Sequence, residues 1–251
     1  MALAALTSSA GLLVNSEDRR AELAARLAKV RTRIATACED SGRDRREITL
    51  VAVTKTFPAS DVIALVGLGV RDIGENRDHE AAPKSAEVAA AELDTDVRWH
   101  FVGQLQSNKC RSVVRYADLV HSVDRPSIVD ALARASEKHR DQPLDVLIQV
   151  SLDKDPERGG VTAAELSDLA AMVTEREALR LRGLMAVPPL KADPESEYPR
   201  LAGIAADLRS AFPAATVLSA GMSGDLEVAV RHGATHLRIG SALLGGRPLL
   251  G

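Results

Sequence analysis

The chain contains, at residues 48–53, the run Ile48-Thr49-Leu50-Val51-Ala52-Val53, which is short, almost wholly apolar and rich in β-branched side chains. Such a run is typical of a β-strand that is buried on both faces, as strands of a parallel sheet are when helices cover it. Thr54 and Lys55 follow at once. The stretch therefore predicts a parallel α/β fold, with a lysine at the carboxyl end of its first strand.

Strand-like and helix-like segments alternate along the rest of the chain. We expect seven more strands, at Arg71–Gly74, Arg98–Val102, Asp118–Val123, Leu144–Val150, Leu181–Val187, Thr216–Ser219 and His236–Ile239. We expect helices at Ser60–Leu68, Arg77–Ala91, Gln104–Tyr116, Pro126–Lys138, Ala163–Glu175, Glu195–Ala211 and Gly224–His232. Strict alternation predicts a parallel sheet, and eight strand–helix units favour a closed barrel over an open doubly wound sheet. No GxGxxG motif follows the first strand, which weighs against a dinucleotide-binding fold.

The predicted fold is a single α/β domain, a (β/α)8 TIM barrel with an extra N-terminal helix. Apolar side chains recur with helical spacing at Leu23, Leu27, Val30 and Ile34. They predict a helix over Asn15–Cys38. The last unit has only Ser241–Leu244 after its strand, and we expect the N-terminal helix to cover the resulting gap. Residues 1–14 are predicted to be a flexible N-terminal extension, and residues 15–251 a single domain.

Composition excludes several classes of function. The net charge is −3 and aromatic residues make up 2% of the chain, so the basic patch and stacking rings of a nucleic-acid-binding protein are missing. No basic residue precedes Arg19, as an export signal would require, and no run approaches the ~18 apolar residues of a membrane-spanning helix. Cys38 and Cys110 are isolated, which is typical of a reducing compartment. We therefore expect a cytoplasmic protein.

Two histidines lie within predicted strands, His100 in the third and His121 in the fourth. At such positions, we expect buried histidines with a structural role and hydrogen-bonded rings. No HxH or HExxH spacing occurs in the chain. We therefore predict no metal site.

Lys55 is the first candidate for chemistry, because the active sites of this kind of barrel lie at the carboxyl ends of the strands. A lysine amine that the barrel mouth partly desolvates is well suited to attack an aldehyde. The alternative is a surface lysine that happens to end a strand. Position alone does not decide between the two.

A phosphate site is expected at the ends of strands seven and eight, where barrels of this kind commonly bind phosphate. After strand seven, Gly221 and Gly224 allow close approach of a ligand to the backbone, and Ser223 adds a hydroxyl beside a helix start. Ser223 is equally suited to cap that helix. After strand eight, the stretch Arg238–Ser241 supplies a second group of backbone donors and a guanidinium. A lysine and a phosphate cradle at one barrel mouth suit pyridoxal 5′-phosphate (PLP), an aldehyde that carries a phosphate.

Six segments occur in order along the chain and together resemble the pyridoxal phosphate homeostasis protein family, whose barrel is similar to the N-terminal domain of alanine racemase. They are Ala52-Val53-Thr54-Lys55, Gly74-Glu75-Asn76, Trp99-His100-Phe101-Val102-Gly103-Gln104-Leu105-Gln106-Ser107-Asn108-Lys109, Arg182-Gly183-Leu184-Met185-Ala186, Gly221-Met222-Ser223-Gly224-Asp225 and Arg238-Ile239-Gly240. The Trp99–Lys109 run is the most specific. The resemblance covers roughly Ile48 to Gly246.

The resemblance implies that PLP is the cofactor and assigns roles by position. Lys55 matches the Schiff-base lysine, and Arg238 matches the arginine that faces the pyridine nitrogen. Asn76 and Met222 are expected to line the cofactor pocket. The phosphate contacts implied are Ser223, Gly240 and Ser241. Arg77 stands where many members have tyrosine, so it is left out of the predicted site, and Arg158 is a loosely matched further ligand.

Two functions from different classes compete. The first is a PLP-binding protein that acts in intracellular PLP homeostasis, hands the cofactor to apo PLP-dependent enzymes and has no dedicated substrate. The second is a PLP-dependent amino-acid racemase or lyase with weak or partner-dependent activity. Neither Tyr116 nor Tyr198 is an evident second acid–base group, and the chain ends at Gly251 without the further domain that supplies one in alanine racemase. An always-protonated Arg238 also disfavours a protonated pyridine ring. We therefore expect a carrier, and a monomer.

Overall fold

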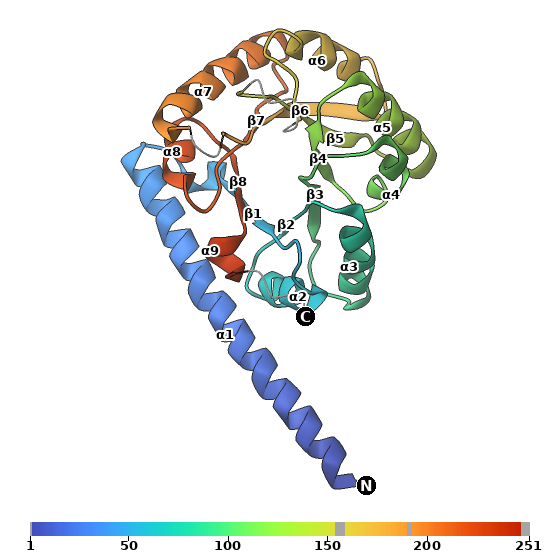
Figure 1. Ribbon diagram of the computed structural model, residues 1–251, viewed down its shortest axis with the longest axis vertical. Helices are drawn as coiled ribbons and strands as arrows, with labels where there is room; N and C mark the ends of the chain where they lie inside the picture. Colours follow the sequence, from blue (N-terminus) through green and yellow to red (C-terminus); the bar gives the residue numbers. More distant parts are fainter. Residues whose placement is uncertain (1, 154–158, 190–191, 247–251) are drawn as a thin grey trace.

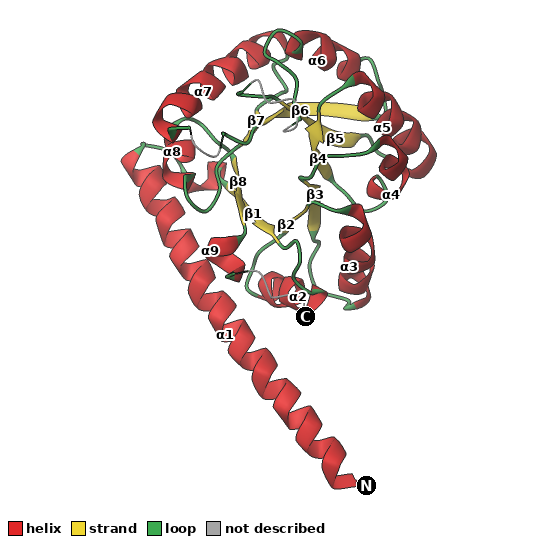
Figure 2. Ribbon diagram, viewed as in Figure 1, coloured by secondary structure: helices red, strands yellow, loops and turns green. Residues whose placement is uncertain are grey.

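Eight parallel strands form a closed barrel in the order β1 to β8, and β1 pairs with β8 to complete it (Figure 2). The computed structural model describes residues 2–153, 159–189 and 192–246, with side chains from Ser16 onward. The strands are β1 (Thr49–Val53), β2 (Asp72–Glu75), β3 (Arg98–Phe101), β4 (Leu119–Val123), β5 (Leu144–Gln149), β6 (Leu179–Met185), β7 (Val217–Ser219) and β8 (His236–Ile239). The predicted (β/α)8 barrel is confirmed, and every predicted strand is present.

Helices surround the barrel (Figure 1). They are α1 (Ala2–Asp40), α2 (Ala59–Gly67), α3 (Asp78–Ala90), α4 (Cys110–Val113), α5 (Pro126–His139), α6 (Leu166–Thr174), α7 (Pro194–Ala211), α8 (Leu226–Arg231) and α9 (Ser241–Leu244), with short 3-10 turns η1 (Arg45–Glu47) and η2 (Ser107–Lys109). Apolar side chains between these helices and the strands form the main core. Over the described ranges, no helix is both long and apolar enough to cross a bilayer.

The segment after β3 departs from the prediction. A helix over Gln104–Tyr116 is wrong, because only η2 and the single turn of α4 are helical there. Gln106 is still extended, at φ −93° and ψ 141°. The chain stays extended where Gly103 passes directly against the backbone of Asn76, and a Cβ on Gly103 would lie 2.0 Å from the Asn76 carbonyl oxygen. A tertiary contact, not local propensity, therefore delays the helix.

Helix α1 contacts α8, α9 and α2 on the outside of the barrel, and its N-terminal half extends away from it (Figure 1). Leu23, Leu27, Val30 and Ile34 are buried against the barrel, as their spacing predicts. The helix thus covers the side where α9 is only one turn long, which confirms the predicted packing. It begins at Ala2, earlier than the predicted start at Asn15, while the division of the chain at residue 14 stays a prediction.

Polar side chains occupy the inside of the barrel. His100 and His121 are buried and hydrogen-bonded to each other, as predicted for structural histidines. His236 of β8 lies beside both, with ring centroids 6.0 Å from His100 and 6.4 Å from His121. Because β3, β4 and β8 are not all neighbours, these rings meet only across the barrel interior.

Candidate functional site

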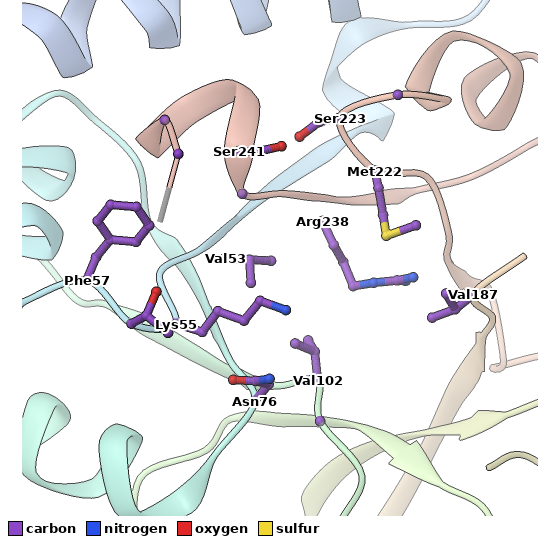
Figure 3. Close-up of a pocket in the computed structure, with 16 residues that line it drawn as sticks. Val53, Lys55, Phe57, Asn76, Val102, Val187, Met222, Ser223, Arg238 and Ser241 are labelled. Carbon is purple, nitrogen blue, oxygen red and sulfur yellow. The ribbon is translucent and has the colours of Figure 1, made fainter. Parts of the chain in front are cut away.

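A cavity of about 570 Å³ opens at the carboxyl ends of the strands, where the fold predicts a site. All seven residues predicted from the sequence line it: Lys55, Asn76, Met222, Ser223, Arg238, Gly240 and Ser241. In Figure 3 the side chains of Lys55, Asn76 and Arg238 extend into the space, and the Ser223 and Ser241 hydroxyls face each other at one edge. The structure thus brings the predicted residues together, while their contacts with a cofactor stay a prediction.

Lys55 presents a free amine to this cavity. It is partly buried beyond the end of β1, and within the described ranges its Nζ has no hydrogen-bond or ion-pair partner. The next residue, Thr56, adopts a positive φ of 68°, which is strained for a β-branched residue. The Thr56 amide donates to Glu80 at 3.0 Å. The chain therefore turns sharply just after the lysine, and the lysine side chain is left pointing into the mouth.

A buried ion pair holds the backbone that carries Lys55. Lys84 of α3 donates to the Glu75 carboxylate at 2.5 Å and to the Thr54 carbonyl at 2.9 Å, and the Thr54 hydroxyl donates to Glu75 at 2.6 Å. Burial raises the pKa of Glu75, although Lys84 and Thr54 oppose that rise. This pair was not predicted from the sequence. The sequence feature that could have revealed it is a lysine at a position on the buried face of α3, between the buried Ala81 and Val88.

The two loops after β7 and β8 form a cradle of donors. In the described part of the chain, the backbone N–H groups of Ser223, Gly224, Gly240 and Ser241 have no hydrogen-bond acceptor. The Ser223 hydroxyl accepts a hydrogen bond from the Ala242 amide at 3.2 Å. Helix α8 begins only at Leu226, after Asp225, so the alternative prediction that Ser223 caps it is wrong. Unpaired amides and two hydroxyls suit an anion such as a phosphate.

Asp225 shapes the first of these loops. Its carboxylate accepts hydrogen bonds from the Met222 amide at 2.6 Å and from the buried Tyr198 hydroxyl at 2.8 Å. Gly221 has a φ of 95°, and a Cβ there would lie 2.6 Å from the Ala229 Cβ. From outside the barrel, Arg33 of α1 donates to the Ser223 carbonyl at 2.9 Å. The contacts of Tyr198 and Arg33 did not follow from sequence spacing, because each joins elements far apart in the chain.

Arg238 lies at the base of the cavity and is only 6% exposed. Its Nη1 donates to the Ser219 carbonyl and hydroxyl, both at 2.7 Å, and its Nη2 donates to the Ala186 carbonyl at 2.8 Å. Burial lowers the pKa of Arg238 to about 10, which still leaves it cationic at neutral pH. A guanidinium has five N–H donors. Two therefore remain for a group in the cavity.

Two arginines left out of the predicted site can also be placed. The Arg77 side chain is 62% exposed, pairs with Glu80 and does not line the cavity. Arg158 lies outside the described residues. Among the described residues, no cluster of histidine, cysteine or acidic side chains is arranged to hold a metal ion.

Comparison with known proteins places the chain in a family. The family described as "Alanine racemase, N-terminal domain" matches residues 25–248. The "Pyridoxal phosphate homeostasis protein" of Mycobacterium tuberculosis is 48% identical over 246 residues, covering 92% of this chain and 95% of that protein. The chain belongs to the pyridoxal phosphate homeostasis protein family. Its Escherichia coli K12 member is 41% identical over 235 residues, covering 90% of this chain and 97% of the relative.

A solved structure supports the same placement. PipY of Synechococcus elongatus PCC7942, in a structure described as having PLP bound, is 32% identical to this chain and superposes with a TM-score of 0.77. The match covers 89% of this chain and 100% of PipY. Both the predicted family and the predicted alanine racemase-like barrel are therefore confirmed.

The Lys84–Glu75 pair yields a prediction. Replacing Lys84 with methionine leaves the Glu75 carboxylate buried without its cation, so Lys84→Met should lower the free energy of unfolding by about 3–5 kcal/mol. The measurement is urea denaturation at neutral pH. The deficit should shrink as the pH is lowered toward the raised pKa of Glu75, because protonation removes the buried charge.

Two further variants serve as controls for this prediction. Adding Glu75→Gln to Lys84→Met should recover part of the loss, because a neutral amide is cheaper to bury than an unpaired carboxylate. Arg231→Met breaks the exposed Arg231–Glu195 pair and should change stability by about 1 kcal/mol or less. If Lys84→Met proved as stable as Arg231→Met, the buried pair would contribute no more to stability than an exposed one.

Proposed function

We propose that this protein binds PLP in the cavity, holds it as a Schiff base on Lys55 and acts in PLP homeostasis and carriage without a dedicated substrate. The observation that carries the proposal is the pairing, in one cavity, of a free lysine amine with a cradle of unpaired backbone amides. PipY, a relative 32% identical over 89% of this chain, is described as having PLP bound. The family name points to the same cofactor.

The residues present fit each part of PLP. Ser223, Ser241 and the neighbouring amides would hold the phosphate, and the free donors of Arg238 would face the pyridine nitrogen. The Lys55 amine would condense with the aldehyde, which forms one C=N bond and releases one water molecule. Asn76 and Met222 would close the sides of the pocket. When bound, PLP supplies an electron sink for reactions at amino-acid carbons.

The lining favours storage of the cofactor over turnover. A cationic Arg238 can only donate to the pyridine nitrogen, and an unprotonated ring is a weaker electron sink. Racemisation also needs a second acid–base group on the face opposite the lysine. The Tyr198 hydroxyl is hydrogen-bonded to Asp225 and the Tyr116 hydroxyl to Asp78, and neither tyrosine is among the residues lining the cavity. Among the described lining residues, Lys55 is the only one that carries an amine, imidazole, carboxylate, thiol or phenol.

The lysine assignment predicts a spectroscopic loss. Purified wild-type protein with PLP should absorb in the visible band of a PLP Schiff base, and Lys55→Ala should lose that band. Borohydride reduction of the wild type should fix the cofactor on the peptide that contains Lys55, as read by mass spectrometry. Lys109→Ala, which removes an exposed lysine beside the mouth, should keep the band. A Lys55→Ala protein that retains the band would exclude the assignment.

The carrier role predicts transfer without turnover. The PLP-loaded protein should restore activity to an apo PLP-dependent enzyme, while the Lys55→Ala protein, incubated with PLP and then desalted, should not. The same loaded protein should exchange the α-proton of alanine with solvent deuterium no faster than free PLP does. Exchange at an enzyme-like rate, on the order of 1 s⁻¹ or more, would favour the racemase or lyase alternative instead.

We also propose that the protein works as a monomer in the cytoplasm. Cys38 and Cys110 are both unpaired and buried, which suits a reducing compartment. The barrel closes on itself and buries its core within one chain. Sedimentation equilibrium should therefore return a mass near 26.7 kDa, and a mass twice as large would contradict the monomer.

A further inference from the structure

A chain of hydrogen bonds crosses the inside of the barrel beneath the cavity. The His100 Nε2 lies 2.9 Å from Asp72, the His100 Nδ1 lies 2.9 Å from the His121 Nε2, and the His121 Nδ1 lies 2.9 Å from the Ser219 hydroxyl. Arg238 then donates to that hydroxyl at 2.7 Å. All five side chains are buried. The chain connects β2, β3 and β4 with β7 and β8, on the other side of the barrel.

Asp72 fixes the far end of this chain as an acceptor. Arg98, at the start of β3, donates to both carboxylate oxygens, at 2.8 Å and 2.7 Å. Burial opposes ionisation, but the hydrogen bonds from His100 and Arg98 outweigh it and lower the pKa of Asp72. A carboxylate has no proton to give. The His100 Nε2 must therefore carry the hydrogen that points at Asp72.

The direction of the remaining bonds follows from the two imidazoles. Burial, together with the cationic Arg238 nearby, lowers the pKa of His121 well below its usual range, so His121 is neutral and holds one hydrogen. If that hydrogen is on Nε2, it donates to the His100 Nδ1, and the His121 Nδ1 accepts from the Ser219 hydroxyl. The Ser219 oxygen then keeps its lone pairs for Arg238. In this arrangement every bond has one donor and one acceptor.

The opposite tautomer of His121, with its hydrogen on Nδ1, disrupts this series of hydrogen bonds. With the hydrogen on Nδ1, His121 would donate to the Ser219 oxygen, which already accepts from Arg238. The Ser219 hydroxyl would then have to turn its own hydrogen elsewhere, and the His121 Nε2 would have no hydrogen to donate to the His100 Nδ1. Leaving such buried groups unpaired is unfavourable. The Nε2–H tautomer is therefore favoured at His121.

We propose that Ser219 and His121 are positioning residues for Arg238, and that the chain from Asp72 orients its guanidinium toward the cavity. Two Nη1 contacts with Ser219 and one Nη2 contact with Ala186 hold the guanidinium, which leaves its other two donors directed at the ligand. This inference rests on the proposed function for the identity of that ligand, the pyridine nitrogen of PLP. The donor and acceptor directions along the hydrogen-bond chain do not depend on PLP.

The ligand-free protein offers the first test. In protein labelled with ¹⁵N-histidine, His121 should appear as the neutral Nε2–H tautomer, with a slowly exchanging proton. A His121 that carries its hydrogen on Nδ1, or that titrates near neutral pH, would overturn the proposal whether or not the protein binds PLP.

The second test compares three variants loaded with PLP. His121→Leu removes the acceptor for Ser219 and should raise the dissociation constant of PLP about tenfold, the effect expected from loss of one well-oriented charge-assisted hydrogen bond. It should also move the ¹⁵N resonance of the PLP ring nitrogen toward that of a ring with no hydrogen bond. His121→Asn keeps an acceptor oxygen near the position of Nδ1 and should restore most of both properties.

His236→Leu is the matched control. His236 is a neighbouring histidine inside the barrel, but its Nδ1 pairs with Thr235 and it has no bond to Arg238. It should leave the affinity and the ring resonance near the wild-type values. Equal effects of His121→Leu and His236→Leu, in a wild type that does bind PLP, would reduce His121 to a packing role. Failure of the wild type to bind PLP would instead refute the proposed function.

Discussion

The pairing of β1 with β8 is the contact on which the site depends. Val51 lies opposite Arg238 in this ladder, and Ala52 lies opposite Ile239. Since both strands run in the same direction, Lys55 and Ser241 follow them at the same end of the barrel. In an open sheet the first and last strands of the chain would be separate edges, and a lysine on one could not face a donor cradle on the other. Closure of the barrel therefore creates the cavity.

Closure of the barrel also encloses polar side chains, which need hydrogen-bond or ion-pair partners in the interior. The inside of such a barrel is usually filled with branched apolar side chains. Here it contains a carboxylate, imidazoles and a guanidinium, all largely withdrawn from water. Such groups are tolerated when each is paired, and within the described ranges none of the side chains in the Asp72–Arg238 chain leaves a buried polar atom unsatisfied. The interior thus supports the floor of the site as well as filling the barrel.

The same geometry bears on the choice between carrier and enzyme. The strongly held guanidinium at the base of the cavity adds donors without adding a group that exchanges protons. Lys55, with no second acid–base group among the described lining residues, supports the proposed capture of an aldehyde over proton transfer through a carbanion. Contacts from the surrounding helices, such as Arg33 with the Ser223 carbonyl and Lys84 with the Thr54 carbonyl, hold the loops that line the cavity.

The sequence by itself determined the strands, their parallel order and the residues at the cavity. Short β-branched runs and helical spacing are local signals, and the rule that sites lie at the carboxyl ends of barrel strands converts them into positions, so the sequence was enough to find Lys55, Ser223 and Arg238. Only the tertiary structure decided what holds them. The Lys84–Glu75 pair, the contact of Gly103 with Asn76 that shortened a predicted helix, and the chain from Asp72 to Arg238 each join different elements. Their energies come from burial and from distances of a few ångströms, and neither can be read from spacing along the chain.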